Sequence, residues 1–150
     1  MDQAVVYYKH AIELDRTFAK AWVGLSNARS NQAGHGFYPI RQGYQEAREA
    51  AEKALLLDQN LAAAHGALGM IRMSIDWDWE RADASFKQEL SLEPENPFAF
   101  AHIAYMDLVR HRFAEGMDHY RQAVDRDPLN PAANRDFGVM CLWQGQKSRV

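Results

Sequence analysis

The stretch LSLEP at residues 90–94 decides the fold, because versions of it recur along the chain. The other versions are IELDR at 12–16, LLLDQ at 55–59 and VDRDP at 124–128. Their last residues are spaced by 43, 35 and 34 positions. A period near 34 residues is typical of proteins built from repeated helix-turn-helix units. The first interval is longer because it contains an insertion at 31–43.

Each of these pentapeptides lies between two kinds of helix. The closing helix, which precedes it, carries small and aromatic residues on one face. These are Ala4-Tyr8-Ala11, Ala47-Ala51-Ala54, Ala82-Phe86-Glu89 and Gly116-Tyr120-Ala123. The opening helix, which follows it, carries a first marker residue, then a large residue three positions later and, in the next position, a small residue. These are Trp22-x-x-Leu25-Ser26, His65-x-x-Leu68-Gly69, Phe100-x-x-Ile103-Ala104 and Asn134-x-x-Phe137-Gly138.

This alternation resembles the tetratricopeptide-repeat family, whose pattern is W-x-x-L-G-x-x-Y, then A-x-x-x-F-x-x-A, then P. The resemblance covers essentially all of residues 1–150 and implies an all-α, right-handed superhelical solenoid of helical hairpins. We expect a single array fragment with half repeats at 2–15 and 131–144 and full repeats at 19–58, 62–93 and 97–127. Seven or eight helices and no sheet should result.

A narrower resemblance rests on GFYP at 36–39, KALLLD at 53–58, DWDW at 76–79 and PLNPAANRDFG at 128–138. Together they look like the repeat arrays attached to bacterial signalling proteins. Those proteins include CadC-like winged-helix regulators, nucleotide cyclases and protein kinases. The resemblance implies that this chain is the docking or regulatory part of a larger bacterial signalling or transcription-regulatory protein.

The composition argues against several classes of partner. The chain has 17 Lys and Arg against 20 Asp and Glu, with no block of like charges, so we expect no direct nucleic-acid partner. No apolar run reaches the roughly 18 residues of a membrane span, and the start lacks the pattern of a signal peptide. We therefore expect no membrane contact in this fragment. The expected location is the cytoplasm, or the periplasm if the full chain carries a membrane span.

The residue patterns that carry chemistry are missing from the sequence. It contains no His-x-x-x-His pair, H-E-x-x-H, G-x-S-x-G or phosphate-binding loop. His65 takes the place of an opening aromatic, which indicates a core or interface residue. Cys141 lies in the row of Phe137, which predicts a buried, inert thiol. We therefore predict that the chain is not an enzyme and has no catalytic residue, metal site or cofactor.

Two connections have alternative interpretations. Gly34, Gly36, Pro39 and Gly43 predict an enlarged turn over 31–43. It is either a binding loop that presents His35, Phe37, Tyr38 and Arg41, or a packed loop whose two rings cover the hairpin end, and we favour the second. The carboxylates of DWDW permit a calcium loop, but a structural turn is favoured. In that turn Asp78 caps the next helix and the two tryptophans staple the turn to neighbouring helices.

In the tetratricopeptide-repeat family the opening helices line the concave side. Steps of three, four and three positions define the rows that face it. The candidate partner-binding residues are Lys20, Val23, Asn27, Met70, Met73, Phe98, Tyr105, Leu108 and Arg135, and Val139 and Leu142 lie in the same rows. Small Gly66 should leave room for an amphipathic helix or an extended segment.

These rows allow alternative interpretations. Some of their residues can instead pack against adjacent hairpins. A carboxylate clamp is not expected, because only Lys20 and Asn27 match that pattern. The preferred partner is a protein or peptide segment, and the alternative is a sensor domain that holds a small molecule in the aromatic groove.

The two half repeats predict self-association. Their apolar stripes are Ala4, Tyr8 and Ala11 at one end and Phe137, Met140, Cys141, Leu142 and Trp143 at the other. In repeat arrays each unit buries its faces only against its neighbours. We therefore expect a homodimer through one or both ends of this fragment, formed either end to end or by exchange of terminal helices, as a property of the fragment.

Overall fold

The computed structural model describes residues 2–147, and eight α-helices account for most of them. They are α1 (Asp2–Leu14), α2 (Ala19–Gly34), α3 (Ile40–Leu57), α4 (Ala62–Ile71), α5 (Trp79–Leu92), α6 (Pro97–Val109), α7 (Phe113–Arg126) and α8 (Pro131–Lys147). A short π-helical turn, η1 (Arg72–Asp76), extends α4. The described part contains no strand, so the prediction of an all-helical chain with seven or eight helices is confirmed.

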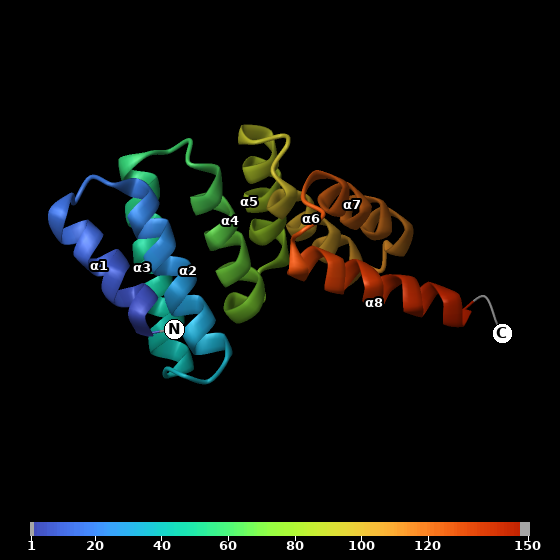
Figure 1. The fold of residues 1–150 in the computed structure, drawn as a ribbon, viewed down its shortest axis with the longest axis horizontal. Helices are drawn as coiled ribbons and strands as arrows, with labels where there is room; N and C mark the ends of the chain where they lie inside the picture. Colours follow the sequence, from blue (N-terminus) through green and yellow to red (C-terminus); the bar gives the residue numbers. More distant parts are fainter. Residues whose placement is uncertain (1, 148–150) are drawn as a thin grey trace. The chain divides into compact units, whose positions relative to one another are not determined.

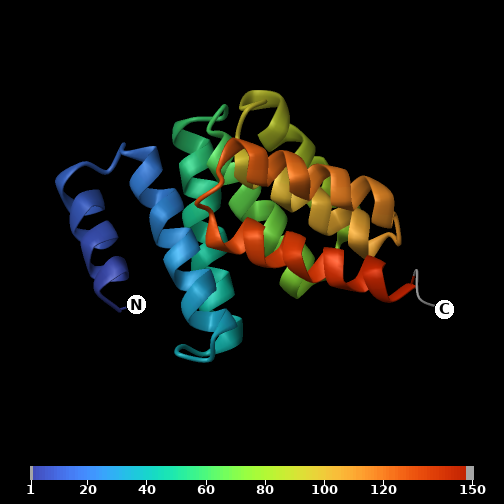
Figure 2. The ribbon, with the colours of Figure 1, turned by 45° about the vertical axis from the view of Figure 1, so that its right-hand side comes forward.

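The chain divides into two compact units. Unit 1 covers residues 1–92 and unit 2 covers residues 93–150. In unit 1, α2 packs along α3 and α4 packs along α5, while α1 contacts α2 (Figure 1). In unit 2, α6 packs along α7, and α8 lies alongside α7 (Figure 2). Each of the three pairs is a helical hairpin.

An aspartate in three of the four recurring pentapeptides forms the turn between hairpins. Its carboxylate accepts a hydrogen bond from the backbone N–H two residues later, the geometry of an Asx turn. The three bonds are Thr17 N to Asp15 Oδ1 at 2.8 Å, Asn60 N to Asp58 Oδ1 at 3.0 Å and Leu129 N to Asp127 Oδ1 at 3.3 Å. At these three sites the recurrence in sequence is therefore a recurrence of one turn geometry. At the fourth, Glu93 Oε2 instead accepts from Asn96 Nδ2 at 2.8 Å.

A second bond ties three of the four opening residues to the end of the pentapeptide six positions earlier. Trp22 Nε1 donates to the carbonyl of Arg16 at 3.1 Å. Asn134 Nδ2 donates to the carbonyl of Pro128 at 2.8 Å, and His65 Nε2 lies 3.0 Å from the carbonyl of Gln59. At the fourth site Phe100 offers no donor, and the guanidinium of Arg126 lies over its ring, 4.1 Å from the centroid. His65 is thus a structural residue of the turn.

In two of the three hairpins the core forms where an aromatic ring of the closing helix meets a small residue of the opening helix. In unit 1 the fully buried ring of Phe86 fills the space beside Gly69, where even a Cβ atom would overlap the ring. In unit 2 buried Tyr120 packs in one cluster with Ala104 and Met140. The small residue is what allows the helices to approach closely enough to enclose the ring.

The insertion at 31–43 is mostly helical, so the predicted enlarged turn is wrong in its extent. α2 continues to Gly34 and α3 begins at Ile40, which leaves a loop of residues 35–39. Gly36 bends it with a φ of 75°, a conformation that glycine adopts readily. Tyr38 packs under the guanidinium of Arg29, whose central carbon lies 4.4 Å from the centroid of the Tyr38 ring. Phe37, in contrast, is exposed. Only one of the two rings covers the hairpin end.

The carboxylate of Glu46 completes the packing of this loop. Tyr38 Oη donates to Glu46 Oε1 at 2.9 Å, and Arg29 Nε lies 2.8 Å from Glu46 Oε2. Burial raises the pKa of Glu46, but hydrogen bonds from Gln42 and Tyr38 and the nearby positive charges outweigh it. The pKa of Glu46 is therefore lowered, and that of Tyr38 is raised because it donates to this carboxylate.

In the Asp-Trp-Asp-Trp turn the predicted cap is confirmed, but the predicted packing of Trp77 is wrong. Asp78 caps α5, since its Oδ1 accepts from Arg81 N at 3.0 Å. The staple role is wrong for Trp77, which is exposed and contacts Trp79 edge to face, with 5.7 Å between the ring centroids. The reason is η1, which ends at Trp77 in the left-handed conformation with a φ of 55°. This change of direction leaves the indole in solvent.

Candidate protein-binding surfaces

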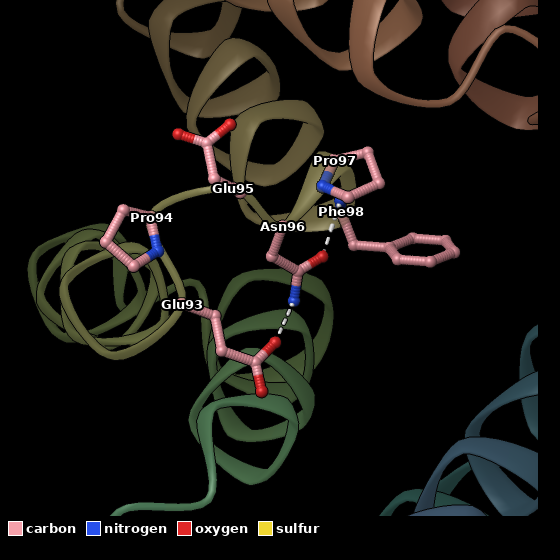
Figure 3. Close-up of a pocket in the computed structure, with 6 residues that line it drawn as sticks. All are labelled: Glu93, Pro94, Glu95, Asn96, Pro97 and Phe98. Carbon is pink, nitrogen blue, oxygen red and sulfur yellow. Dashed lines mark hydrogen bonds between the residues drawn. The ribbon is translucent and has the colours of Figure 1, made fainter.

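The start of α6 fixes the position of the most exposed aromatic residue in the candidate set. Asn96 caps the helix by accepting from Phe98 N at 2.9 Å, and its amide donates to Glu93 Oε2 at 2.8 Å (Figure 3). Pro97 occupies the first turn, where its fixed φ suits a helix and no N–H is needed. The ring of Phe98 points away from this turn (Figure 3). A well-defined cap therefore supports an exposed ring.

The two faces of α6 differ in what covers them. Phe100, Ile103 and Ala104 are buried in unit 2. On the other face, Phe98 is 54% exposed and Tyr105, two turns later, is 45% exposed. This spacing of seven residues places both rings on one side of the helix. Leu108, one turn further on, is half-buried against the cluster of Met117 and Tyr120 and adds less surface.

The corresponding face of α8 continues this surface chemistry within unit 2. Arg135, Val139 and Leu142 are exposed at spacings of four and three residues. Arg135 Nε donates to Asp136 Oδ1 at 2.7 Å. This hydrogen bond, together with the negative charge of Asp136, raises the pKa of the Arg135 guanidinium. In the sequence, Val139 and Leu142 fall in the same rows as the candidates. Their exposure is what now adds them to the candidates.

A buried tyrosine links α6, α7 and α8 below this surface. Burial raises the pKa of Tyr120, and the negative charge of Asp136 and the phenol of Tyr105 raise it further. Tyr120 of α7 packs in one cluster with Ala104 of α6 and Met140 of α8. The candidate residues of unit 2 thus belong to one region of that unit.

Asp107 holds α6 against α7 behind the exposed rings. Its buried carboxylate lies 2.7 Å from His119 Nδ1 and also forms an ion pair with Arg112. The backbone N–H of Arg112 donates to the Asp107 carbonyl at 2.8 Å. Because a buried carboxylate is stable only when it is paired, these contacts fix the geometry of the hairpin.

Unit 1 presents a smaller set of accessible candidates. Lys20 and Asn27 are exposed on α2, and Met70 is exposed on α4. Val23 and Met73 are buried and offer no accessible surface in this structure. The expectation that Gly66 leaves room for a ligand is wrong, because the Glu89 carboxylate occupies the place where a Cβ of Gly66 would lie.

A shallow depression of about 610 Å³ lies at the turn before α6. Its lining is a single run of six residues, 93–98, drawn in Figure 3. It is open to solvent, and its polar groups at Asn96 and Glu93 are bonded to each other. The depression therefore offers few converging polar groups to orient a small molecule.

Cys141 is exposed, so the prediction of a buried thiol is wrong. The aligned residue on α6 is Asp107, which α7 covers, whereas no closing helix follows α8 in the described chain. Trp143, part of the predicted apolar stripe, has a side chain outside the described part. Within the described residues, no group of His, Cys, Asp and Glu is arranged to hold a metal ion. No helix described here is long and apolar enough to cross a membrane.

Comparison with solved structures supports the repeat fold. The thermophilic tetratricopeptide-repeat protein TTC0263 of Thermus thermophilus matches with a TM-score of 0.75 and 21% identity, over 93% of this chain and 72% of that one. Cut9, solved with Hcn1 as an APC/C hetero-tetramer, matches with a TM-score of 0.71 and 16% identity, over 93% of this chain and 26% of that one.

A third match is the first repeat domain of Spaghetti (RPAP3), bound to the HSP90 peptide SRMEEVD. It has a TM-score of 0.59 and 12% identity, over 80% of this chain and 93% of that one. No protein-family model and no curated protein matches the sequence. The helical hairpins and these likenesses together give the chain the tetratricopeptide-repeat fold, an all-α solenoid architecture.

Proposed function

We propose that this chain is a protein-interaction module. Its main binding surface is the exposed face of α6 and α8 in unit 2, and its partner is the apolar side of an amphipathic helix or an extended segment. The observation that carries the proposal is the exposure of Phe98 and Tyr105 on one side of a helix whose other side is buried. Lys20, Asn27 and Met70 form an additional contact region on unit 1.

The exposed rings support a binding function because they are costly to leave in water. Phe and Tyr side chains bury about 150 to 250 Å² each when they are covered, and they dominate the energetics of interfaces. Val139 and Leu142 add aliphatic surface, and Arg135 contributes a cation at the rim. Aromatic and arginine side chains of this kind are the usual anchors of protein interfaces.

The rigidity of the platform favours the same function. The Asn96 cap holds the start of α6, and the Asp107 contacts hold the side that faces α7. A surface that is already ordered loses little conformational entropy when a partner binds. Most of the interaction energy of the rings is then available for affinity.

Two of the similar structures are complexes, which supports a peptide or protein as the partner. RPAP3 was solved with an HSP90 peptide and Cut9 with Hcn1. A carboxylate clamp is not part of the proposal, because only Lys20 and Asn27 match that pattern. We place the module in a bacterial signalling or transcription-regulatory protein on the basis of the sequence resemblance alone, with the cytoplasm as the proposed location.

The alternative of a small-molecule sensor has weaker support. The depression at residues 93–98 is open and is lined by one turn. A sensor pocket usually buries most of its ligand. The solvent-facing rings of α6 are better placed to cover another chain than to enclose a metabolite.

The test is selection from a phage-displayed random-peptide library against the purified chain. Selected peptides are then titrated by fluorescence anisotropy against Phe98→Ala and Tyr105→Ala. Each truncation should weaken binding by about 30-fold, the effect of losing about 2 kcal/mol at an interface anchor. Thermal melts should change little, because both side chains are largely exposed.

Phe37→Ala is the matched control, since it removes an exposed aromatic ring from the loop of unit 1. It should leave the affinity of the selected peptides unchanged. The proposal fails if selection enriches no peptide, or if the enriched peptides bind the Phe98 and Tyr105 variants as tightly as the original chain.

A further inference from the structure

The turn between α4 and α5 (Figure 1) exposes an indole in a conformation that a bulky side chain disfavours. Trp77 follows η1 with a φ of 55° and a ψ of 26°, in the left-handed region. Glycine and asparagine adopt this region readily, whereas a bulky residue there is a genuine outlier. The indole gains little from burial in return, because Trp77 is 68% exposed. Folding alone therefore does not explain a tryptophan at this position.

Groups other than the indole hold the turn in its shape. The backbone N–H groups of Trp77 and Asp78 both donate to the carbonyl of Arg72. Arg48 of α3 donates to both carboxylate oxygens of Asp76, each at 2.7 Å. The indole is thus presented on a fixed support that does not depend on it. Costly conformations of this kind cluster at sites that bind a ligand.

The residues around the exposed indole are acidic. Positions 73–80 contain three carboxylates, which alternate with the two tryptophans, and no Lys or Arg. The carboxylates belong to Asp76, Asp78 and Glu80. The first is paired with Arg48, and the second lies 3.5 Å from Arg81 Nε. Glu80 is exposed and forms no ion pair within the described part of the chain. An uncompensated negative charge beside an open aromatic face favours a cation as the ligand.

The chain itself shows how an arginine binds to such a combination of groups. Arg29 lies over the ring of Tyr38, and its Nε is 2.8 Å from a carboxylate oxygen of Glu46. A planar guanidinium can stack on a ring and still direct its N–H groups to a carboxylate at the edge of that ring. A lysine ammonium is a compact point charge and does not stack in this way.

A second example of the same arrangement lies in unit 2. The guanidinium of Arg126 lies over the ring of Phe100, and its Nε donates to Glu95 Oε2 at 2.9 Å. At the turn before α5 the ring of Trp77 and the carboxylate of Glu80 are present. Within the described part of the chain, however, no Arg or Lys lies over this indole. The turn therefore has two of the three groups and lacks the arginine.

We infer that the turn at residues 76–80 binds an arginine-bearing segment of a partner protein. The guanidinium of that arginine stacks on the open face of Trp77 and forms an ion pair with Glu80. Trp79 contacts Trp77 edge to face and so fixes the orientation of the exposed indole. The site lies on unit 1 and uses no residue of the α6 and α8 face. It is a second binding surface, and it does not depend on the function proposed for the first.

The first experiment locates the contact with a peptide probe. The probe carries three arginines separated by Gly-Ser pairs and has blocked termini, and glutamine replaces each arginine in the reference peptide. Each peptide is added to isotopically labelled protein while the indole N–H signals are followed by NMR. The arginine peptide should shift the signals of Trp77 and Trp79, but not that of Trp22, whose Nε1 is bonded to the carbonyl of Arg16. The glutamine peptide should shift none of them.

The second experiment compares affinities by fluorescence anisotropy of the labelled arginine peptide. Trp77→Asn should weaken binding by about fivefold, the contribution of a cation over an exposed ring. Glu80→Gln should weaken it by about threefold, as expected for an exposed ion pair. Glu52→Gln is the matched control, because Glu52 is an exposed glutamate on α3 of the same unit. This control and Phe98→Ala on α6 should leave the affinity unchanged.

Thermal melts separate binding from a structural role of the indole. Asparagine tolerates the left-handed conformation, so Trp77→Asn should leave the melting temperature unchanged or raise it. A clear fall would show that the indole supports the fold and would overturn the inference. Unchanged binding in Trp77→Asn, equal weakening by Glu52→Gln and Glu80→Gln, or no shift of the Trp77 signal at about 5 mM peptide would do the same. Choline that shifts this signal at a lower concentration than the peptide would replace the partner protein with a small organic cation, and would also overturn it.

Discussion

The same substitution at two aligned glycines should change stability in opposite directions. Gly69 and Gly138 occupy the same register position of an opening helix, but only Gly69 faces a buried ring. In both helices alanine is favoured over glycine by about 1 kcal/mol, because glycine loses more backbone entropy on folding. The difference between the two sites therefore isolates the cost of the steric overlap.

The overlap at Gly69 should outweigh the gain in helix propensity. The ring of Phe86 is fully buried and has no free space to move into. Overpacking of a well-packed core costs about 1 to 3 kcal/mol. Gly69→Ala should therefore destabilise the chain by about 1 kcal/mol net. Gly138→Ala meets no neighbour and should stabilise its helix by up to about 1 kcal/mol.

Urea unfolding followed by circular dichroism measures both changes. Gly69→Ala should also be measured in a Phe86→Leu background, which removes the outer part of the ring. There the overlap is relieved, and the loss caused by Gly69→Ala should shrink or reverse. Equal effects of Gly69→Ala in the two backgrounds would show that the ring does not limit this position, and would refute the packing described for the hairpin.

Three further predictions concern unit 1. Ala82→Trp should destabilise by at least about 1 to 3 kcal/mol, because Ala82 is fully buried, whereas exposed Gln45→Ala should do little; similar thermal melts would contradict the register. Ser26→Ala should stabilise by about 1 kcal/mol in urea unfolding, since the Ser26 hydroxyl is buried without a hydrogen-bond partner among the described atoms; a loss of stability would contradict this. Glu46→Gln should destabilise at neutral pH. The pKa of Glu46 in the folded chain lies below its ordinary value of 4.5. The difference in unfolding free energy between the original chain and the variant should therefore be complete above pH 4.5 and disappear as the pH falls through the lowered pKa. A difference that does not depend on pH would contradict this prediction.

The hairpin architecture was accessible from the sequence because its determinants are local. In three of the four pentapeptides the acidic residue accepts a hydrogen bond from the backbone N–H two positions later. Three of the four opening residues reach back to the carbonyl six positions earlier. Small residues at regular spacing then mark the faces that pack. These features repeat along the chain, so each occurrence supports the interpretation of the others. The place of His65 followed from this register, and the structure shows the bond that explains it.

The errors arose where the outcome depends on what lies next to a residue rather than on its register. Cys141 is exposed because the helix that covers the aligned Asp107 has no counterpart beside α8 in the described chain. The space beside Gly66 is occupied because Glu89, which departs from the repeat pattern, extends its carboxylate over this glycine. The π-helical turn that redirects Trp77 leaves no periodic signal in five residues. Among the candidate residues, periodicity identified the exposed rings of α6 but did not separate them from buried Val23 and Met73.

The bond from an opening residue to the carbonyl six positions earlier, which three of the four sites form, has a consequence for how such repeats diverge. An indole, an imidazole and a carboxamide all meet the same carbonyl in this one chain. The requirement at that position is a donor at a certain reach, and several unrelated side chains satisfy it. Mutation can therefore exchange them one at a time without passing through an unfolded intermediate sequence. Such tolerance is compatible with the low identity, 12% to 21%, between this chain and structures that share its fold.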